Sequence, residues 1–185
     1  MTVVKKYVTA QELLDDSFQL GLKILQSDFR PKFIVGVWRG GTPTGIAVQE
    51  IMDYYGVHTD HISIRTSSYI GMQQQKEVKV HGEGGSIVGE LKDKKVLVVD
   101  DVLTAGTALK QSLEIISQEG GSAIGCLVAL DREEILDDLL ARDKIFQDFS
   151  ISVTSIAKIS QLIEFLEDCE RHDEAKIIKN YLLGT

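Results

Sequence analysis

Two adjacent carboxylates, Asp100 and Asp101, follow an apolar run and precede a turn of small and hydroxyl-bearing residues. The run Lys95–Val99 is short and β-branched, which is typical of a central strand in a parallel sheet. The turn Thr104–Thr107 opens a helical pattern, so backbone N–H groups and the positive end of a helix would face a bound anion, and Gly106 allows its close approach. We predict a phosphate monoester in this turn and vicinal sugar hydroxyls on the carboxylates, which together describe a ribose 5-phosphate.

The segment from Val98 to Thr107, Val-Val-Asp-Asp-Val-Leu-Thr-Ala-Gly-Thr, resembles the phosphoribosyl diphosphate (PRPP) motif of type I phosphoribosyltransferases. These pentosyltransferases exchange the diphosphate of PRPP for a nitrogenous base. A strand with a chance Asp-Asp and a glycine turn is the alternative, and the agreement of both acidic positions with the whole loop disfavours it. The resemblance implies Mg²⁺ on PRPP, near the carboxylates but without a direct protein ligand. It also implies that PRPP contacts Asp100, Asp101, Thr104, Ala105, Gly106 and Thr107. The two carboxylates are expected to be catalytic by stabilising cationic character on the ribose, with Asp101 favoured as the proton acceptor if one is needed.

A second loop, Trp38–Gly45, places paired glycines beside a fixed cation. Exposed amides next to an arginine can cradle a diphosphate, and an ordinary glycine turn is the alternative. The order Arg-Gly-Gly before a helix resembles the diphosphate loop of 6-oxopurine phosphoribosyltransferases, a loop that often contains a non-proline cis peptide bond. The resemblance implies that diphosphate binds to Arg39, Gly40, Gly41 and Thr42.

The polar segment 66–85 carries two lysines and a histidine among glycines. Its pattern Lys-x-x-Lys-x-His-Gly-Glu-Gly-Gly resembles the mobile catalytic loop of orotate phosphoribosyltransferases, whereas a solvated charge run is the alternative. The resemblance implies that Lys76, Lys79 and His81 reach diphosphate, with Lys79 and His81 catalytic. In that family the loop commonly enters the neighbouring subunit's site, which implies a homodimer. Gln75 replaces a basic residue of the family pattern, and this predicts a weaker cluster of cations.

A third strand-end loop begins at Asp131 and continues through Arg132 to Glu134. A helix cap with a solvated neighbour is the ordinary interpretation of Asp-Arg at this position. The sequence Ala-Leu-Asp-Arg-Glu-Glu also resembles the orotate enzymes, and this implies that Arg132 recognises the base. A guanidinium matches a planar carboxylate through two parallel N–H···O bonds.

The elements that must position these loops alternate between helices and strands, with a capping box at Thr9 and Glu12. Strands are predicted over Phe33–Val37, Thr59–Arg65, Lys95–Val99, Ala123–Leu130 and Ile151–Ile156. Helices are predicted after Thr9, over Gly45–Tyr55, from the phosphate turn to about Glu119, after Asp131 to about Ala141, and over Lys158–Asp168 and Glu174–Leu183. This order predicts an α/β fold with a doubly wound, mainly parallel sheet flanked by helices. We expect residues 1–185 to form a single phosphoribosyltransferase domain with a small or reduced hood.

Charge and cysteine content limit which partners and which cellular compartment we expect. The 28 acidic and 20 basic residues give a net charge of −8, which argues against general affinity for nucleic acid or an anionic membrane. No segment approaches the ~20 apolar residues of a membrane span. Cys126 and Cys169 lack metal-ligand spacing, so we expect free thiols in a reducing compartment, the cytoplasm.

The sequence does not decide which base is bound, because the family that the chain resembles changes near His81-Gly82. Residues 1–81 resemble hypoxanthine-type enzymes, and residues 82–185 resemble orotate phosphoribosyltransferases; a mosaic origin, natural or constructed, is therefore a hypothesis. The substrates implied are PRPP and a nucleobase, and Arg132 favours orotate. The alternatives are a hypoxanthine, guanine or xanthine phosphoribosyltransferase of purine salvage, and a PRPP-binding regulator without turnover.

Overall fold

The computed structural model of the chain describes residues 9–65, 80–81 and 90–183. These residues form a six-stranded sheet in the order β3-β2-β1-β4-β5-β8, in which β3 is antiparallel to its neighbour and the other strands are parallel. The strands are β1 (Phe33–Val37), β2 (Asp60–Ile64), β3 (Val80–His81), β4 (Lys95–Leu103), β5 (Ser122–Asp131) and β8 (Val153–Lys158). The mainly parallel sheet predicted from the sequence is confirmed.

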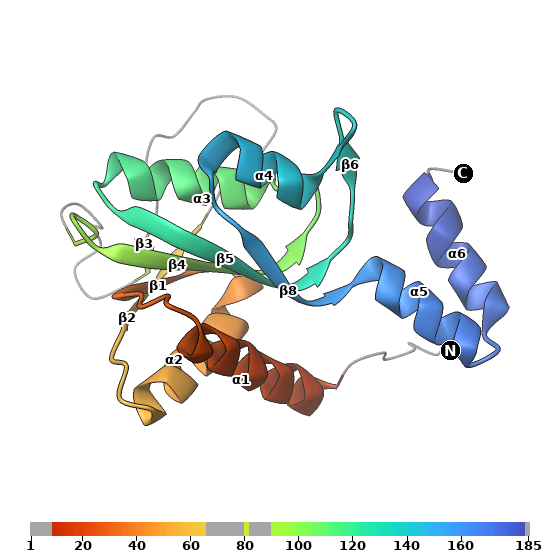
Figure 1. Cartoon of the computed structure of the whole chain (residues 1–185), viewed down its shortest axis with the longest axis horizontal. Helices are drawn as coiled ribbons and strands as arrows, with labels where there is room; N and C mark the ends of the chain where they lie inside the picture. Colours follow the sequence, from red (N-terminus) through yellow and green to blue (C-terminus); the bar gives the residue numbers. More distant parts are fainter. Residues whose placement is uncertain (1–8, 66–79, 82–89, 184–185) are drawn as a thin grey trace.

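Helices cover both faces of the sheet (Figure 1). The helices α1 (Ala10–Gln26) and α2 (Gly41–Tyr54) lie on one face, and α3 (Thr107–Gln118) and α4 (Ala141–Phe149) lie on the other. The last two, α5 (Ile159–Asp168) and α6 (His172–Leu183), continue from the end of β8 and pack against each other. This arrangement is the doubly wound architecture that the alternating order predicts.

The central strands are apolar without interruption because both of their faces are buried. Within β1, Ile34 packs into the core on the side of α1 and α2, whereas Val35 packs into the core on the side of α3. Leu97 and Val98 of β4 divide in the same way, and all four side chains are fully buried. The two cores hold the carboxyl ends of β1 and β4 at one edge of the sheet.

Three predicted boundaries are wrong, and two of them place residues of the predicted loops within a strand or a helix. β4 runs to Leu103, because its ladder with β5 continues as far as the pair Leu103–Asp131, so the two carboxylates lie within the strand. α2 begins at Gly41 rather than Gly45, which makes most of the predicted diphosphate loop its first turn.

The third error concerns the helix predicted after Asp131. That segment is a two-stranded hairpin of β6 (Ile135–Leu136) and β7 (Leu139–Leu140), and α4 starts where the predicted helix should end. The hairpin turn is made by Asp137 and Asp138, both with positive φ, a conformation that a helix cannot contain.

The other boundaries agree with the predictions within a few residues. The capping box of α1 is present, with the Glu12 N–H donating to Thr9 Oγ1 at 3.1 Å and the Thr9 N–H donating to Glu12 Oε2 at 2.7 Å. Both cysteines are free, Cys126 buried and Cys169 exposed. Within the described part of the chain, no helix combines the length and the apolar character needed to cross a membrane.

Candidate active site

The candidate site lies where the sheet changes its direction of winding. β1 and β4 are parallel neighbours, and the helices that follow them, α2 and α3, depart to opposite faces. The amino ends of both helices therefore begin beside the same pair of strand ends. In open α/β sheets, ligands bind in the crevice at such a switch point, beyond the carboxyl ends of the strands.

The glycine pair at the start of α2 presses directly against the carboxylate segment of β4. A Cβ atom at Gly40 would lie 1.8 Å from Asp101 Oδ2, and one at Gly41 would lie 2.1 Å from the Val99 carbonyl oxygen. At Gly41 a side chain would meet the backbone of β4, so glycine is what allows the two segments to meet there, whereas at Gly40 a side chain would require the Asp101 carboxylate to move. Two loops that the sequence predicts for one site are in contact.

The two carboxylates have different surroundings. Asp100 is only 6% exposed, and its Oδ1 accepts a hydrogen bond from the Asp101 N–H at 2.8 Å. Burial raises the pKa of Asp100 to about 7, with the neighbouring charge of Asp101 adding to the effect. Asp101 is exposed, and its Oδ1 accepts from the Val102 N–H at 2.8 Å. The buried carboxyl can thus exchange a proton near neutrality, while the carboxylate of Asp101 is exposed at the end of β4.

The predicted phosphate turn, Thr104–Thr107, ends in the first residue of α3. Gly106 has φ +73° and precedes the first turn of α3, where no side chain of the described residues caps the backbone N–H groups. A Cβ atom at Gly106 would lie 3.1 Å from Ile145 Cδ1 on α4. The positive φ and this close packing both favour glycine here. The N–H groups of the first turn of α3 are suited to hold an anion.

The predicted diphosphate loop is joined to β2 as well as to β4. The peptide bond between Trp38 and Arg39 is cis, and the Trp38 N–H donates to the Ile64 carbonyl oxygen at 2.8 Å. The hydroxyls of Thr42 and Ser63 lie 3.4 Å apart. The end of β2 therefore borders the loop that starts α2.

The backbone of β3 pairs with this end of β2, with Val80 opposite Ile64 and His81 opposite Ser63. Residues 80–81 of the predicted catalytic loop therefore lie beside the candidate site. Lys76 and Lys79 lie outside the described residues, as does the side chain of His81.

Arg132 follows β5, one strand along from β4, at the same edge of the sheet. Its backbone N–H donates to the Leu103 carbonyl oxygen at 3.0 Å. Its guanidinium is a quarter exposed, pairs with Glu134 at 3.0 Å and lies 5.0 Å above the ring centroid of Tyr181 on α6. The structure thus places Arg132 at the edge of the sheet that carries the two carboxylates. Its contacts with Glu134 and Tyr181 could not be predicted from the sequence.

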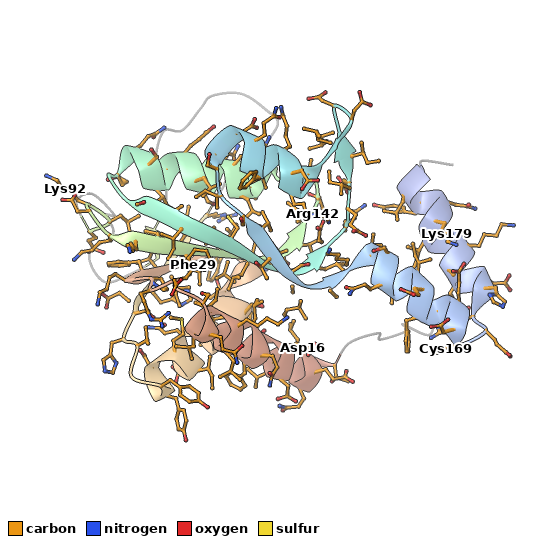
Figure 2. The ribbon with its side chains drawn as sticks, in the orientation of Figure 1. Asp16, Phe29, Lys92, Arg142, Cys169 and Lys179 are labelled. Carbon is orange, nitrogen blue, oxygen red and sulfur yellow. The ribbon has the colours of Figure 1, made fainter. Side chains whose placement is uncertain are left out.

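The backbone on either side of Arg132 is held by an ionic cluster around the buried carboxylate of Asp131. Arg142, which comes from the first turn of α4 (Figure 2), donates to Asp131 Oδ2 at 2.6 Å and to Glu133 Oε1 at 3.2 Å. Asp131 is only 2% exposed and also accepts from the Glu133 N–H at 2.8 Å. The hydrogen bond to Asp131 raises the pKa of Arg142, which keeps the guanidinium charged. The sequence offered no signal for Arg142, because the hairpin that brings it back was predicted as a helix.

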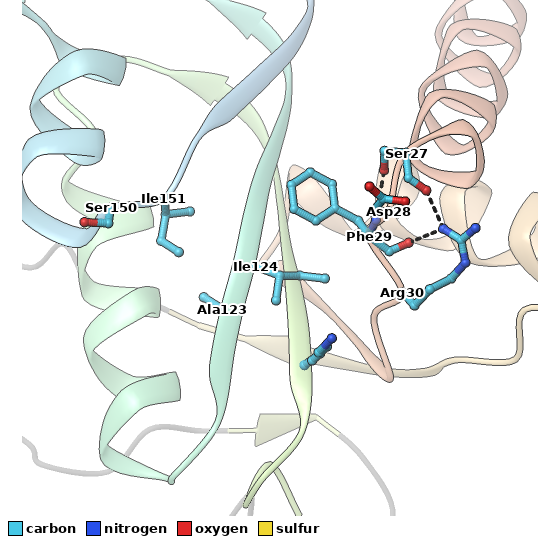
Figure 3. A pocket seen from close by; sticks show the side chains of 9 residues that line it. Ser27, Asp28, Phe29, Arg30, Ala123, Ile124, Ser150 and Ile151 are labelled. Carbon is cyan, nitrogen blue, oxygen red and sulfur yellow. Dashed lines mark hydrogen bonds between the residues drawn. The ribbon is translucent and has the colours of Figure 1, made fainter.

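A separate cavity of about 600 Å³ lies at the amino ends of β4 and β5, away from the carboxylates (Figure 3). It is lined by residues 27–30, Lys95, residues 123–124 and residues 150–151. The Arg30 guanidinium donates to the carbonyl oxygens of Ser27 and Phe29, at 2.6 and 2.7 Å. These contacts give hydrogen-bond partners to two carbonyl oxygens just beyond α1. The lining includes a single carboxylate residue, Asp28, and lacks the adjacent carboxylates and the glycine pair of the switch point.

Comparison with known proteins gives a family match over most of the chain. Residues 4–158 match the family described as phosphoribosyl transferase domain. The chain is 41% identical over 113 residues to orotate phosphoribosyltransferase 2 of Saccharomyces cerevisiae, an alignment that covers 58% of this chain and 50% of that protein. It is 48% identical over 96 residues to orotate phosphoribosyltransferase of Pseudomonas fluorescens, with coverage of 51% and 45%. The chain thus spans about half the length of the curated relatives it matches.

The fold is also found among solved structures. Orotate phosphoribosyltransferase of Francisella tularensis superposes with a TM-score of 0.65 at 23% sequence identity, over 94% of this chain and 81% of that one. At this identity the likeness shows the fold, and it confirms the architecture predicted from the sequence.

Proposed function

The chain belongs to the phosphoribosyl transferase domain family, and we propose that it transfers the 5-phosphoribosyl group of PRPP to orotate. The products are orotidine 5′-phosphate and diphosphate, a step of pyrimidine biosynthesis. The observation that carries the proposal is the contact between Asp100-Asp101 and the glycine pair at positions 40 and 41, between the amino ends of two helices. This arrangement offers acceptors for ribose hydroxyls and N–H donors for two anions.

In the proposed reaction the bond between C1 of the ribose and the diphosphate breaks while a base nitrogen bonds to C1. The transition state resembles an oxocarbenium ion, so positioning and charge stabilisation are the main contributions of the protein. Asp100 and Asp101 hold the ribose, and the structure favours Asp100 as the group that exchanges a proton near neutral pH. The 5-phosphate binds to Thr104, Ala105, Gly106 and Thr107, and the diphosphate binds to Arg39, Gly40, Gly41, Thr42, Lys76, Lys79 and His81.

Mg²⁺ fits the donor set of this site, because it prefers oxygen ligands and retains several waters. Asp100 and Asp101 would hold it indirectly, through the ribose hydroxyls and water. When bound to PRPP it would supply positive charge to the departing diphosphate. The described residues contain no group of three or more His, Cys, Asp or Glu side chains that could hold a metal ion by themselves.

Arg132 favours orotate over a neutral base. A carboxylate can accept two parallel N–H···O bonds from a guanidinium, whereas a neutral purine would leave those donors without a charged partner in a partly desolvated place. The glycine loop after β1 supports the second candidate, a 6-oxopurine phosphoribosyltransferase, because it resembles that class of enzyme. The mosaic origin stays a hypothesis, motivated by the same division of the chain.

The proposal includes a cytoplasmic homodimer in which residues 66–85 of each subunit reach the neighbouring site. Free cysteines support a reducing compartment. We also propose that residues 1–185 form one domain, because helices from both halves of the described chain cover the same sheet.

The base is tested by incubating the protein with PRPP, Mg²⁺ and, separately, orotate, hypoxanthine, guanine and xanthine. We expect nucleotide formation with orotate and its loss in Arg132→Ala, while PRPP binding measured by calorimetry is unchanged. Turnover of a purine without turnover of orotate would favour the second candidate. Binding of PRPP without turnover of any base would favour a regulator.

A further inference from the structure

We propose that Tyr181 on α6 is a positioning residue for Arg132, so that the C-terminal helix helps to determine which base is accepted. The inference rests on the proposed function of Arg132 and adds a specificity determinant far from it in the sequence. Its basis is the cation–π contact between the two side chains, in which Arg132 Cζ lies over the Tyr181 ring at 5.0 Å from the ring centroid.

A stacked aromatic ring orients a guanidinium without using its hydrogen bonds. The N–H donors of arginine lie in the guanidinium plane, whereas the cation–π contact is made through the face of that plane. Among the described residues, the in-plane partner of the Arg132 guanidinium is Glu134, whose Oε1 lies 3.0 Å from Nη2. The remaining in-plane donors are therefore available, in a fixed orientation, for a planar carboxylate.

The backbone near Arg132 is already fixed, so the freedom left is that of its long side chain. The Arg142 cluster holds residues 131 and 133, and the Leu103 carbonyl oxygen holds the N–H of Arg132 itself. An arginine side chain has many accessible rotamers, and ordering it on binding costs conformational entropy. A contact that restricts it before the base binds lowers the entropy cost of binding.

The helix that carries Tyr181 is itself tied to this part of the molecule. Glu133 Oε2 accepts from the Ser160 N–H in the first turn of α5 at 3.0 Å, which joins the end of β5 to the C-terminal helix pair. Lys179 of α6 pairs with Glu167 of α5, and Ala175 of α6 is buried. The contact between Arg132 and Tyr181 therefore joins the end of β5 to α6, and both of these segments are held by other contacts.

The test compares Tyr181→Ala, Tyr181→Phe and wild type in steady-state kinetics with PRPP and orotate. The phenylalanine variant retains the ring and should match wild type. The alanine variant should raise the KM for orotate about two- to fivefold, the factor expected for one exposed cation–π contact, and leave the KM for PRPP unchanged. Ile177→Ala is the control: it lies one turn earlier on α6 and is 68% exposed, against 67% for Tyr181.

The outcomes separate this inference from the proposed function. If wild type uses orotate and Arg132→Ala abolishes that use, an unchanged KM in Tyr181→Ala overturns the inference alone. Equal defects in the alanine and phenylalanine variants, or an equal rise in the KM for PRPP, would also overturn it. If wild type transfers phosphoribosyl to no base or only to purines, the proposed function fails and the inference falls with it.

Discussion

Asp100 and Asp101 are neighbours in sequence, but only one of them is buried. The sequence could place both at the carboxyl end of an apolar strand, because that pattern depends on local periodicity. It could not predict which carboxylate is desolvated, since burial depends on β5 on one side and on the start of α2 on the other. The sequence favours Asp101 as the proton acceptor, whereas burial, which raises the pKa of Asp100 to about 7, favours Asp100.

The raised pKa of Asp100 predicts a pH-dependent cost to folding. Its ordinary pKa is 3.8, and burial raises it to about 7 in the folded protein, so the folded state holds a proton that the unfolded state has released between these values. Stability from this group is therefore lost as the pH rises through that range, by at most about 4 kcal/mol. Asp100→Asn keeps an oxygen acceptor for the Asp101 N–H and removes this cost.

We expect the Tm of Asp100→Asn, measured by circular dichroism, to exceed that of wild type at about pH 8 and by less at about pH 5. Asp101→Asn is the matched control, because the side chain that it replaces is exposed. An equal gain in Tm at both pH values would show that ionisation of the Asp100 carboxyl does not cause the difference in stability.

The contact between α2 and β4 predicts that Gly41 cannot be replaced. In Gly41→Ala the new Cβ would meet the Val99 carbonyl oxygen at 2.1 Å, so either the helix or the strand must shift. We expect a loss of about 1–3 kcal/mol in the free energy of unfolding, measured by urea denaturation, together with weaker PRPP binding. In the control Gly125→Ala the nearest atom, Leu97 Cδ1, is at an ordinary 3.6 Å, and stability should change little. Equal effects of the two substitutions would contradict the close approach.

At the scale of elements, the segment between β5 and α4 determines how Arg132, the arginine proposed to recognise the base, is held. The sequence predicted a helix after Asp131, because the apolar residues Ile135, Leu139 and Leu140 fit a helical period as well as a hairpin. The positive φ of Asp137 and Asp138 makes the hairpin, and the hairpin returns Arg142 to Asp131. Such a contact depends on tertiary structure, which local patterns do not report.

The ionic cluster at the end of β5 should be necessary for stability. Arg142→Met leaves the buried carboxylate of Asp131 without its cation, a change that typically costs about 3 kcal/mol or more. Lys144→Met removes a cation from the same helix, but its partner Asp148 is a third exposed, so the loss of stability should be small. Chemical denaturation of both variants measures the difference, and a similar loss in each would refute the role of the cluster.

The predicted catalytic loop gives a kinetic prediction. Because a loop that closes over bound substrate acts mainly in the transition state, Lys79→Ala should lower kcat more than it weakens PRPP binding. Lys92→Ala, which removes a lysine next to the start of β4, serves as the charge-matched control and should leave both quantities unchanged. An effect confined to PRPP affinity would indicate a cation that binds the ground state and the transition state equally.

At the scale of the whole molecule, the strand order explains why segments that are far apart in the sequence form one site. β1 and β4 are adjacent, so the loops that follow them meet, and the end of β5 lies one strand away. The alternation of helices and strands predicted this sheet, and the resemblance to phosphoribosyltransferases predicted which strand ends carry the chemistry. The position of α6 beside Arg132 could not be predicted in the same way, because no periodic pattern links Tyr181 to that residue.

The most direct test of the account is transfer itself, followed by chromatography of the nucleotide and a coupled assay of diphosphate. Wild-type protein with PRPP, Mg²⁺ and orotate should form orotidine 5′-phosphate and diphosphate in equal amounts. The variant with both Asp100→Asn and Asp101→Asn should form neither, while its circular dichroism spectrum stays that of the folded protein. Turnover retained by the double variant, or diphosphate released by wild type without a nucleotide product, would contradict the central claim.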